Sequence, residues 1–392
     1  MIIRYFLFII IFILTPLISH SQWQQVLNRE TRCFDVYDST LYAGTYLFGI
    51  QKTTDHGANW NSIFGGAVIF DMKIVSGEIF AAWNNRVARS TNGGLNWSNV
   101  ILPCAFIFSL DHKNGTLIAG TQDSGVYYST NSGTNWSPSS LEGQSVRCIL
   151  VTGNKVFAGT ENSGIFVSTN NGVDWSQTSQ NIGHFRSLTG SGTSIYAGSF
   201  ENGLFRSSDD GVTWEQTAFD TGSVFSIDVQ GNNIFIGGYN YTQAGIFVST
   251  NNGNSWIFLN DEISGEFVFS VFRYSGYFFA GTEHAVYRRP VDEILNVNHL
   301  YAEIPVEYKL SQNYPNPFNP ATKIIFSVTA PGNVKLIVYD HSGKKVKTIL
   351  DKTLSPGTYE NIFTGDELSS GVYYYTLITK DFTETKKMVL VK

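Results

Sequence analysis

The sequence is poor in charge, in cysteine and in long apolar runs. Only 15% of its 392 residues are charged and the net charge is −6, which excludes the basic footprint of a nucleic-acid-binding protein. The three cysteines cannot form a disulfide framework, and neither they nor the seven scattered histidines show metal-ligand spacing. We therefore expect no nucleic-acid partner, no metal and no cofactor.

The longest apolar run lies at the start of the chain. Residues 5–18 are apolar apart from Thr15; Arg4 precedes them and Ser19-His20-Ser21 follows. A charged start, a short apolar stretch and small residues before the cut are typical of a signal peptide, here over residues 1–21. A retained membrane anchor is the alternative, although a run of this length is short for a bilayer span.

A repeated box dominates the next 270 residues or so. The pattern Ser/Thr-x-Asp/Asn-x-Gly-x-x-Trp occurs six times, and its tryptophans are 37, 39, 39, 39 and 42 residues apart. Strands that end in a small-residue pair, such as Ala43-Gly44, occur seven times, one more than the boxes. Trp23 begins a strand like those that follow each box, and the last repeat lacks that strand. The pattern predicts an all-β chain in which residues 22–290 form a seven-bladed β-propeller closed by the N-terminal strand.

The box resembles the Asp-box (BNR repeat) of sialidase-like and photosystem-assembly-factor-like propellers. This resemblance implies a structural turn: the Asp/Asn side chain accepts backbone N–H groups, Gly adopts a positive φ, and Trp packs between blades. Four boxes carry Asn instead of Asp, which excludes acid–base chemistry there. The predicted structural residues are Asp55, Trp60, Asn92, Trp97, Asn131, Trp136, Asn170, Trp175, Asp209, Trp214, Asn251 and Trp256.

The candidate ligand site is the end of the propeller at which the first strand of each blade begins. Alignment of the seven repeats places three arginines and four phenylalanines at equivalent positions, and neighbouring loops add further aromatics. This combination suits an anionic or glycan ligand, because guanidinium groups bind carboxylates and flat rings stack on sugars. The alternative is that Phe fills the axis and Arg solvates its rim. The candidates are Arg32, Phe70, Phe108, Arg147, Arg186, Phe225 and Phe269, with Trp83, Tyr239 and Tyr241 from the loops.

We predict a non-catalytic module that binds a glycan or a protein, and we assign no catalytic residue. A glycoside hydrolase of sialidase-like or xyloglucanase-like type is the alternative. Arg32 is followed by Cys33-Phe34 instead of the Ile-Pro of the sialidase motif, and no pair of carboxylates can be assigned. A periplasmic assembly factor is a third hypothesis.

The C-terminal segment has a different composition. Residues 308–392 hold 11 lysines and 7 acidic residues, whereas residues 1–307 hold 15 basic and 25 acidic groups. After a linker over 291–307, six strand-like runs separated by turn signals predict a small Ig-like β-sandwich over 308–392.

This segment resembles the C-terminal sorting domain of the type IX secretion system. The matches are Asn313-Tyr314-Pro315-Asn316-Pro317-Phe318-Asn319-Pro320, Ser370-Gly371-Val372-Tyr373-Tyr374, and the end from Lys386 to Lys392. The resemblance implies export by an outer-membrane translocon, removal of the tail by a sorting protease, and release or attachment to surface lipopolysaccharide. The expected location is therefore outside a Gram-negative cell or on its outer-membrane surface.

Overall fold

A computed structural model describes residues 23–259, 263, 265–295, 298–301, 307–330, 332–354, 357–366 and 368–392. The predicted signal peptide lies outside these residues, as does part of the predicted linker. Within them the regular structure is strand apart from the single short helix α1 (Val291–Leu295), so the predicted all-β class is confirmed. No helix among the described residues is long and apolar enough to cross a membrane.

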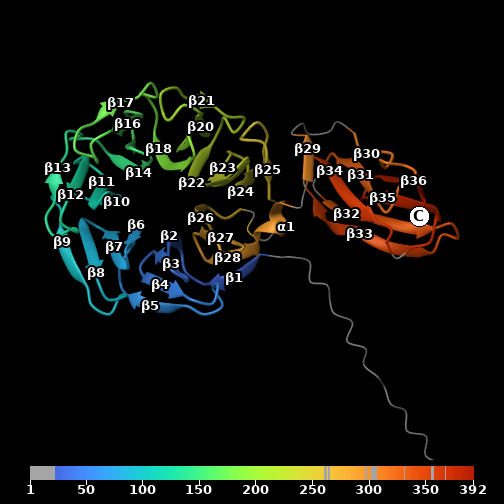
Figure 1. The fold of residues 1–392 in the computed structure, drawn as a ribbon, viewed down its shortest axis with the longest axis horizontal. Coiled ribbons are helices and arrows are strands. Elements are labelled where there is room, and N and C mark those ends of the chain that lie inside the picture. Colours follow the sequence, from blue (N-terminus) through green and yellow to red (C-terminus); the bar gives the residue numbers. More distant parts are fainter. Residues whose placement is uncertain are drawn as a thin grey trace, which may run out of the picture.

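Seven four-stranded sheets form the blades of a propeller (Figure 1). Blade 1 is β2 (Thr31–Tyr37), β3 (Thr40–Thr45), β4 (Gly49–Thr53) and β5 (Asn61–Phe64). Blade 2 is β6 (Asp71–Val75), β7 (Glu78–Trp83), β8 (Arg86–Ser90) and β9 (Ser98–Ile101). Blade 3 is β10 (Ile107–Lys113), β11 (Thr116–Thr121), β12 (Val126–Ser129) and β13 (Ser137–Pro138).

The remaining blades repeat this antiparallel order. Blade 4 is β14 (Val146–Thr152), β15 (Lys155–Thr160), β16 (Ile165–Ser168) and β17 (Ser176–Gln177). Blade 5 is β18 (Phe185–Ser191), β19 (Ser194–Ser199), β20 (Leu204–Ser207) and β21 (Glu215–Gln216). Blade 6 is β22 (Ser223–Gln230), β23 (Asn233–Tyr239), β24 (Ala244–Ser249) and β25 (Ile257–Phe258). Blade 7 is β26 (Val268–Tyr274), β27 (Tyr277–Thr282), β28 (Val286–Pro290) and β1 (Gln24–Leu27).

The ring closes through the N-terminal strand. β1 pairs antiparallel with β28 and supplies the fourth strand of blade 7, next to blade 1 in Figure 1. Trp23, directly before β1, is 5% exposed and packs edge-on against Phe278 with ring centroids 6.1 Å apart. Closure covers the apolar faces of the first and last blades, which an open row of blades would leave exposed.

First strands lie innermost and contact one another around the ring, from β2 to β6 and on to β26 and back to β2. We call the end at which they begin the mouth. Antiparallel pairing puts the hairpins between second and third strands at the mouth, and the box turns at the opposite end. Apolar clusters lie between neighbouring blades; one example joins Phe34 and Leu41 of blade 1 to Phe279 and Val286 of blade 7.

The C-terminal part forms a β-sandwich of two four-stranded sheets. One sheet is ordered β29 (Asn298–Tyr301), β34 (Gly357–Thr364), β31 (Ala321–Val328) and β30 (Lys309–Leu310). The other is β33 (Lys345–Leu354), β32 (Gly332–Asp340), β35 (Gly371–Ile378) and β36 (Thr383–Leu390). The six runs that the sequence indicated correspond to β31 to β36. The structure differs within the predicted linker, where β29 pairs with β34 as an added strand.

The two ends of the sandwich sequence meet at the edge of β36. Phe318 N donates to Val389 O at 2.9 Å, and Val391 N donates to Phe318 O at 3.0 Å. Asn316 Oδ1 accepts the N–H of Val389 at 2.9 Å. Phe318 is 2% exposed and contacts Phe363 in the core. The Pro- and Asn-rich opening therefore covers an edge strand whose backbone groups would otherwise be unpaired.

Candidate functional site at the mouth of the propeller

The seven aligned arginine and phenylalanine residues, here called the mouth ring, sit at a repeated backbone irregularity. In six blades the register of the first strand shifts across one residue, for example between Thr31 and Cys33 and between Phe185 and Ser187. The residue skipped by each shift is a mouth-ring residue. A bulge re-aims the side chain of its extra residue, so the same device presents Arg or Phe toward the axis in blade after blade. Phe70 is the exception: it lies directly before β6. The six shifts skip Arg32, Phe108, Arg147, Arg186, Phe225 and Phe269.

Most neighbours in the mouth ring touch. Phe70 and Phe108 pack edge-to-face at 5.6 Å between centroids, and Phe225 and Phe269 at 5.8 Å. The guanidinium of Arg32 lies over Phe269 at 4.1 Å, that of Arg147 over Phe108 at 4.0 Å, and that of Arg186 over Phe225 at 5.9 Å. All seven residues are partly buried, and their contacts form two runs of cations and aromatic faces, from Arg32 to Arg186 and from Arg147 to Phe70.

Two of the three arginines are neutralised locally. Arg147 pairs with Glu161 at 3.0 Å, and Glu161 also accepts from the Ser145 hydroxyl at 2.7 Å. That hydroxyl bond, followed by Arg147, lowers the pKa of Glu161 against the opposing effect of burial. Arg32 pairs with Glu30. Both acids are thus held by guanidinium groups.

Arg186 has a different environment. Its guanidinium lies over Phe200 at 4.2 Å, and its Nε donates to Nε2 of His184 at 3.4 Å. Among the described residues no carboxylate lies within ion-pair distance of it. Burial lowers the pKa of Arg186. The charges of Arg147 and Arg32 lower it further, whereas the charge of Glu161 raises it.

His184 has the protonation state that this hydrogen bond from Arg186 requires. Burial, and then the charge of Arg186, lower its pKa to about 4. The ring is therefore neutral at physiological pH and can accept the N–H of Arg186. The uncompensated positive charge of the mouth is centred on Arg186 in blade 5.

Further aromatic residues extend the mouth ring outward. Phe106 and Phe267 stand two residues before Phe108 and Phe269 and contact Phe70 and Phe225 at 5.7 and 6.1 Å. Tyr239 packs on Phe267 at 6.0 Å.

Of the three loop candidates, two join this surface. The Tyr239 hydroxyl donates to the carbonyl of Tyr241, and the Tyr241 hydroxyl donates to that of Glu201. Trp83 does not join it. Its indole packs on Phe64 of β5 and donates to Asn99 of β9, so it lies toward the outer strands of blades 1 and 2.

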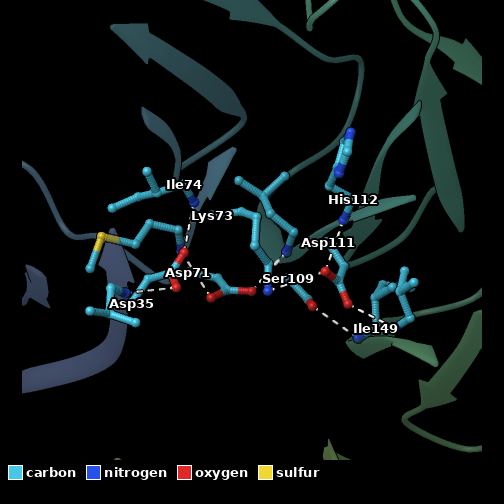
Figure 2. Close-up of polar contacts among 12 residues, drawn as sticks. Asp35, Asp71, Lys73, Ile74, Ser109, Asp111, His112 and Ile149 are labelled. Carbon is cyan, nitrogen blue, oxygen red and sulfur yellow. Dashed lines mark hydrogen bonds and ion pairs between the residues drawn. The ribbon is translucent and has the colours of Figure 1, made fainter. Parts of the chain in front are cut away.

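Deeper along the axis, acidic side chains link one blade to the next (Figure 2). Asp35 accepts the N–H of Ile74 at 2.6 Å, and Asp111 accepts that of Val151 at 2.7 Å. Asp71 accepts the N–H of Leu110 at 2.8 Å. Each bond runs from the first strand of one blade to the first strand of the next. Together they pin blades 1 to 4 around the axis.

The side chain of Lys73 interacts electrostatically with all three of these carboxylates. Lys73 pairs with Asp111 at 3.1 Å. Burial would lower the pKa of Lys73, but Asp111, Asp35 and Asp71 raise it above its usual value. Burial raises the pKa of Asp71 to about 7, although Lys73 and two backbone N–H groups oppose that shift. Burial, with a smaller effect from the charge of Asp111, thus keeps Asp71 protonated at pH values well above its usual pKa.

The six boxes form the same turn each time. In the first, Thr53 Oγ1 accepts the N–H of Gly57 at 2.9 Å and Asp55 Oδ1 accepts that of Asn59 at 2.8 Å. Gly57 has φ of 89°, and Trp60 Nε1 donates to its carbonyl at 3.1 Å. The side chains of Asn92, Asn131, Asn170, Asp209 and Asn251 accept the equivalent backbone N–H groups at 2.9 Å.

The box tryptophans are half-buried at the seams between blades. Trp97, for example, contacts Phe64 of the preceding blade at 4.7 Å between ring centroids. Hydrogen bonds, above all that from the Asn59 side chain, lower the pKa of Asp55 to about 2. In the fifth box the Thr213 side chain has the same effect on Asp209, whose pKa is also about 2. The described residues contain no group of three or more His, Cys, Asp or Glu side chains that could hold a metal ion. Trp60, Trp136, Trp175, Trp214 and Trp256 occupy corresponding clusters.

Two separate parts of the chain match different families. Residues 312–392 match the secretion system C-terminal sorting domain, and residues 114–269 match the DUF6242 beta propeller domain. The first match identifies the C-terminal sandwich as a type IX secretion sorting domain and supports export of the chain. A search of curated proteins gave no significant match.

Solved structures support the propeller fold. YCF48 from Cyanidioschyzon merolae is 12% identical with a TM-score of 0.57, over 69% of this chain and 98% of that one. A structure of YCF48 bound to D1 peptide is 12% identical with a TM-score of 0.54, over 70% and 96%. The GH74 xyloglucanase from Xanthomonas campestris is 12% identical with a TM-score of 0.56, over 94% and 68%. Likeness at this identity shows the fold alone.

Several residues of the site were missed by sequence reasoning. The Phe-x-Phe pairs at 106–108 and 267–269 repeat at equivalent positions and could have indicated the outer aromatic layer. The acids three residues after the mouth ring, Asp35 and Asp111, were a similar signal. The bulges had no such signal, because register is a property of two paired strands.

Proposed function

We propose that this chain is an exported binding protein whose mouth ring takes a ligand with a carboxylate and a flat or apolar face. The observation that carries the proposal is Arg186, a partly buried guanidinium over two phenyl rings with no carboxylate partner among the described residues. A ligand carboxylate would supply the missing charge, and the aromatic surface would contact the rest of the ligand. An acidic glycan and an acidic protein segment both have this chemistry.

The resemblance to Asp-box propellers supports a structural role for the six boxes and leaves the mouth for function. The peptide bound by YCF48 and the glycan specificity named for the GH74 structure show that similar folds serve both ligand classes. A glycosidase remains the less supported candidate, because Glu30 and Glu161 are both held by arginine.

The sorting domain supports a route out of the cell. In this proposal the signal peptide over residues 1–21 leads the chain to the periplasm of a Gram-negative bacterium. The outer-membrane translocon then exports it, and a sorting protease removes the tail. The product is released or attached to surface lipopolysaccharide.

The test is a binding screen of the mature protein on glycan and peptide arrays, with a fluorogenic glycoside panel on the same samples. We expect the bound array members to carry carboxylates. Their binding should be lost in the Arg186→Gln variant and retained in the Arg86→Gln variant. Arg86 is a matched control, since it stacks on Trp83 at 5.2 Å outside the mouth ring. Binding that Arg186→Gln leaves intact, or turnover of a glycoside, would contradict the proposal.

A further inference from the structure

The two outer faces of the sorting domain differ in chemistry. On the sheet that contains β31 and β34, polar groups pair with each other across the strands. Lys323 pairs with Glu360 at 2.9 Å, and the hydroxyls of Ser327 and Thr358 lie 3.0 Å apart. The charges and hydroxyls of this face are thus paired with each other, although one of its apolar side chains, Ile362 opposite Lys323, is 60% exposed.

The opposite face, formed by β32, β35 and β36, is apolar along its middle. Side chains alternate between the core and solvent along each strand, and buried Val338, Tyr373 and Met388 identify the core side. Strand register then places the outward residues next to one another, with Tyr339 opposite Tyr374 and Val372 opposite Val389. Val372 and Tyr374 are 36% and 37% exposed. We call this set the sorting face; it comprises Ile337, Tyr339, Val372, Tyr374 and Val389.

Two exposed lysines flank the tyrosines of the sorting face. Lys345 is paired with Tyr339 in the register, and Lys387 with Tyr374. Within the described part of the chain, neither lysine has an acidic side chain at ion-pair distance. Lys335, farther along β32, is paired with Asp351 at 3.0 Å. Two open positive charges thus stand beside the two tyrosines.

We infer that the sorting face docks on an acidic protein surface of the export machinery. Tyrosine-rich apolar centres rimmed by charge are typical of protein interfaces, and carboxylates opposite the open lysines would give the complementary charge. The sheet edge at β36 is already covered by the segment around Phe318, so the partner does not add a strand at that edge. This inference rests on the sorting role proposed above and names the surface that performs it.

The test uses the full chain, produced in a bacterium that carries type IX export. The variant is Lys345→Glu with Lys387→Glu, and Tyr374→Ser is a second variant without a charge change. The readout is the fraction of the propeller found outside the cell. Loss of a docking charge pair or an interface aromatic should lower that fraction at least about tenfold. The matched control is Lys309→Glu with Lys380→Glu, which changes the net charge equally on exposed lysines away from the sorting face.

Three further measurements separate the outcomes. Equal midpoints of thermal unfolding for the variants and the wild type would show that the tail still folds. A chain lacking residues 308–392 tests the sorting role itself: if it is still exported, that role fails. If the deletion blocks export but the sorting-face variants do not, only the docking inference fails. Normal export followed by loss from the cell surface would also overturn it, since the face would then serve anchoring to anionic lipid.

Discussion

Gln24 and Arg288 are 264 residues apart in sequence, yet Arg288 Nε and Nη2 both donate to Gln24 Oε1, at 3.0 and 2.8 Å. Arg288 also donates to the carbonyl of His56 in the first box and lies over Tyr277 at 4.8 Å. One side chain therefore joins the N-terminal strand, blade 7 and blade 1 at the point where the ring closes.

The closing strand should matter more through its buried tryptophan than through this polar contact. We expect Trp23→Ala to lower the free energy of unfolding by about 3–5 kcal/mol, because it leaves a cavity against Phe278. Gln24→Ala should cost about 0.5–1.5 kcal/mol, as expected for a single hydrogen-bonded site. Denaturant unfolding followed by tryptophan fluorescence measures both, since all eight tryptophans lie before residue 257 and report on the propeller. Equal losses would contradict this ranking.

The box turn should depend on its first hydroxyl. Ser207 is 1% exposed, accepts the N–H of Gly211 at 2.9 Å and donates to Asp209 at 2.8 Å. Ser207→Ala leaves that buried N–H unpaired and should cost about 1–3 kcal/mol in the same unfolding assay. The neighbouring exposed Ser208 is the control, and Ser208→Ala should change stability by less than about 0.5 kcal/mol. A Ser207 variant as stable as the Ser208 variant would show that the turn does not rely on this bond.

Asp71 should make the propeller less stable as the pH rises. The pKa of this side chain is raised from 3.8 to about 7 on folding, so the folded state binds more protons than the unfolded state between these values. Its contribution is fully present below about pH 4 and is lost as the pH rises through 7, with a slope of at most about 1.4 kcal/mol per pH unit. The lowered pKa values of His184 and His112 act in the opposite direction, and the raised pKa of Asp35 acts in the same one.

The difference between wild type and Asp71→Asn isolates this effect, because the other groups are common to both proteins. Urea unfolding at pH 5, 6, 7 and 8 should show the wild type losing stability relative to the variant as the pH increases. A difference that is constant over this range would mean that Asp71 is already ionised in the folded protein at pH 5.

In the sorting domain, Phe318→Ala should destabilise the sandwich without affecting the propeller. The phenyl ring fills the core against Phe363, so its removal should cost about 3–5 kcal/mol. Calorimetry of the full chain should show one transition shifted downward, while the transition seen by tryptophan fluorescence stays in place. A shift of both transitions would show that the two parts unfold as one unit.

The repeat, the small-residue pairs and the surplus strand at Trp23 were enough to predict seven blades and the way in which they close. These features are local patterns with a fixed period, and each has a direct structural meaning. The same alignment selected the mouth ring, because equivalent positions in a repeat occupy equivalent places around the axis.

What the alignment could not supply was the environment of each residue. It gave Arg147 and Arg186 the same position, but only the structure shows that Glu161 neutralises the first and His184 accepts from the second. Trp83 was placed with the loop aromatics although its partners lie on outer strands. The linker strand β29 was missed because pairing with β34 depends on a partner some 60 residues away.

The most direct test of the account is the affinity of the best array ligand for three proteins: wild type, Arg186→Gln and the control Arg86→Gln. Isothermal titration at two salt concentrations would give each dissociation constant. We predict that Arg186→Gln weakens binding at least about tenfold, because a charge-assisted contact in a partly buried site is lost. The control should stay within about twofold of the wild type, which is less than 0.5 kcal/mol. Equal affinities of wild type and Arg186→Gln would contradict the assignment of the mouth ring as the binding site.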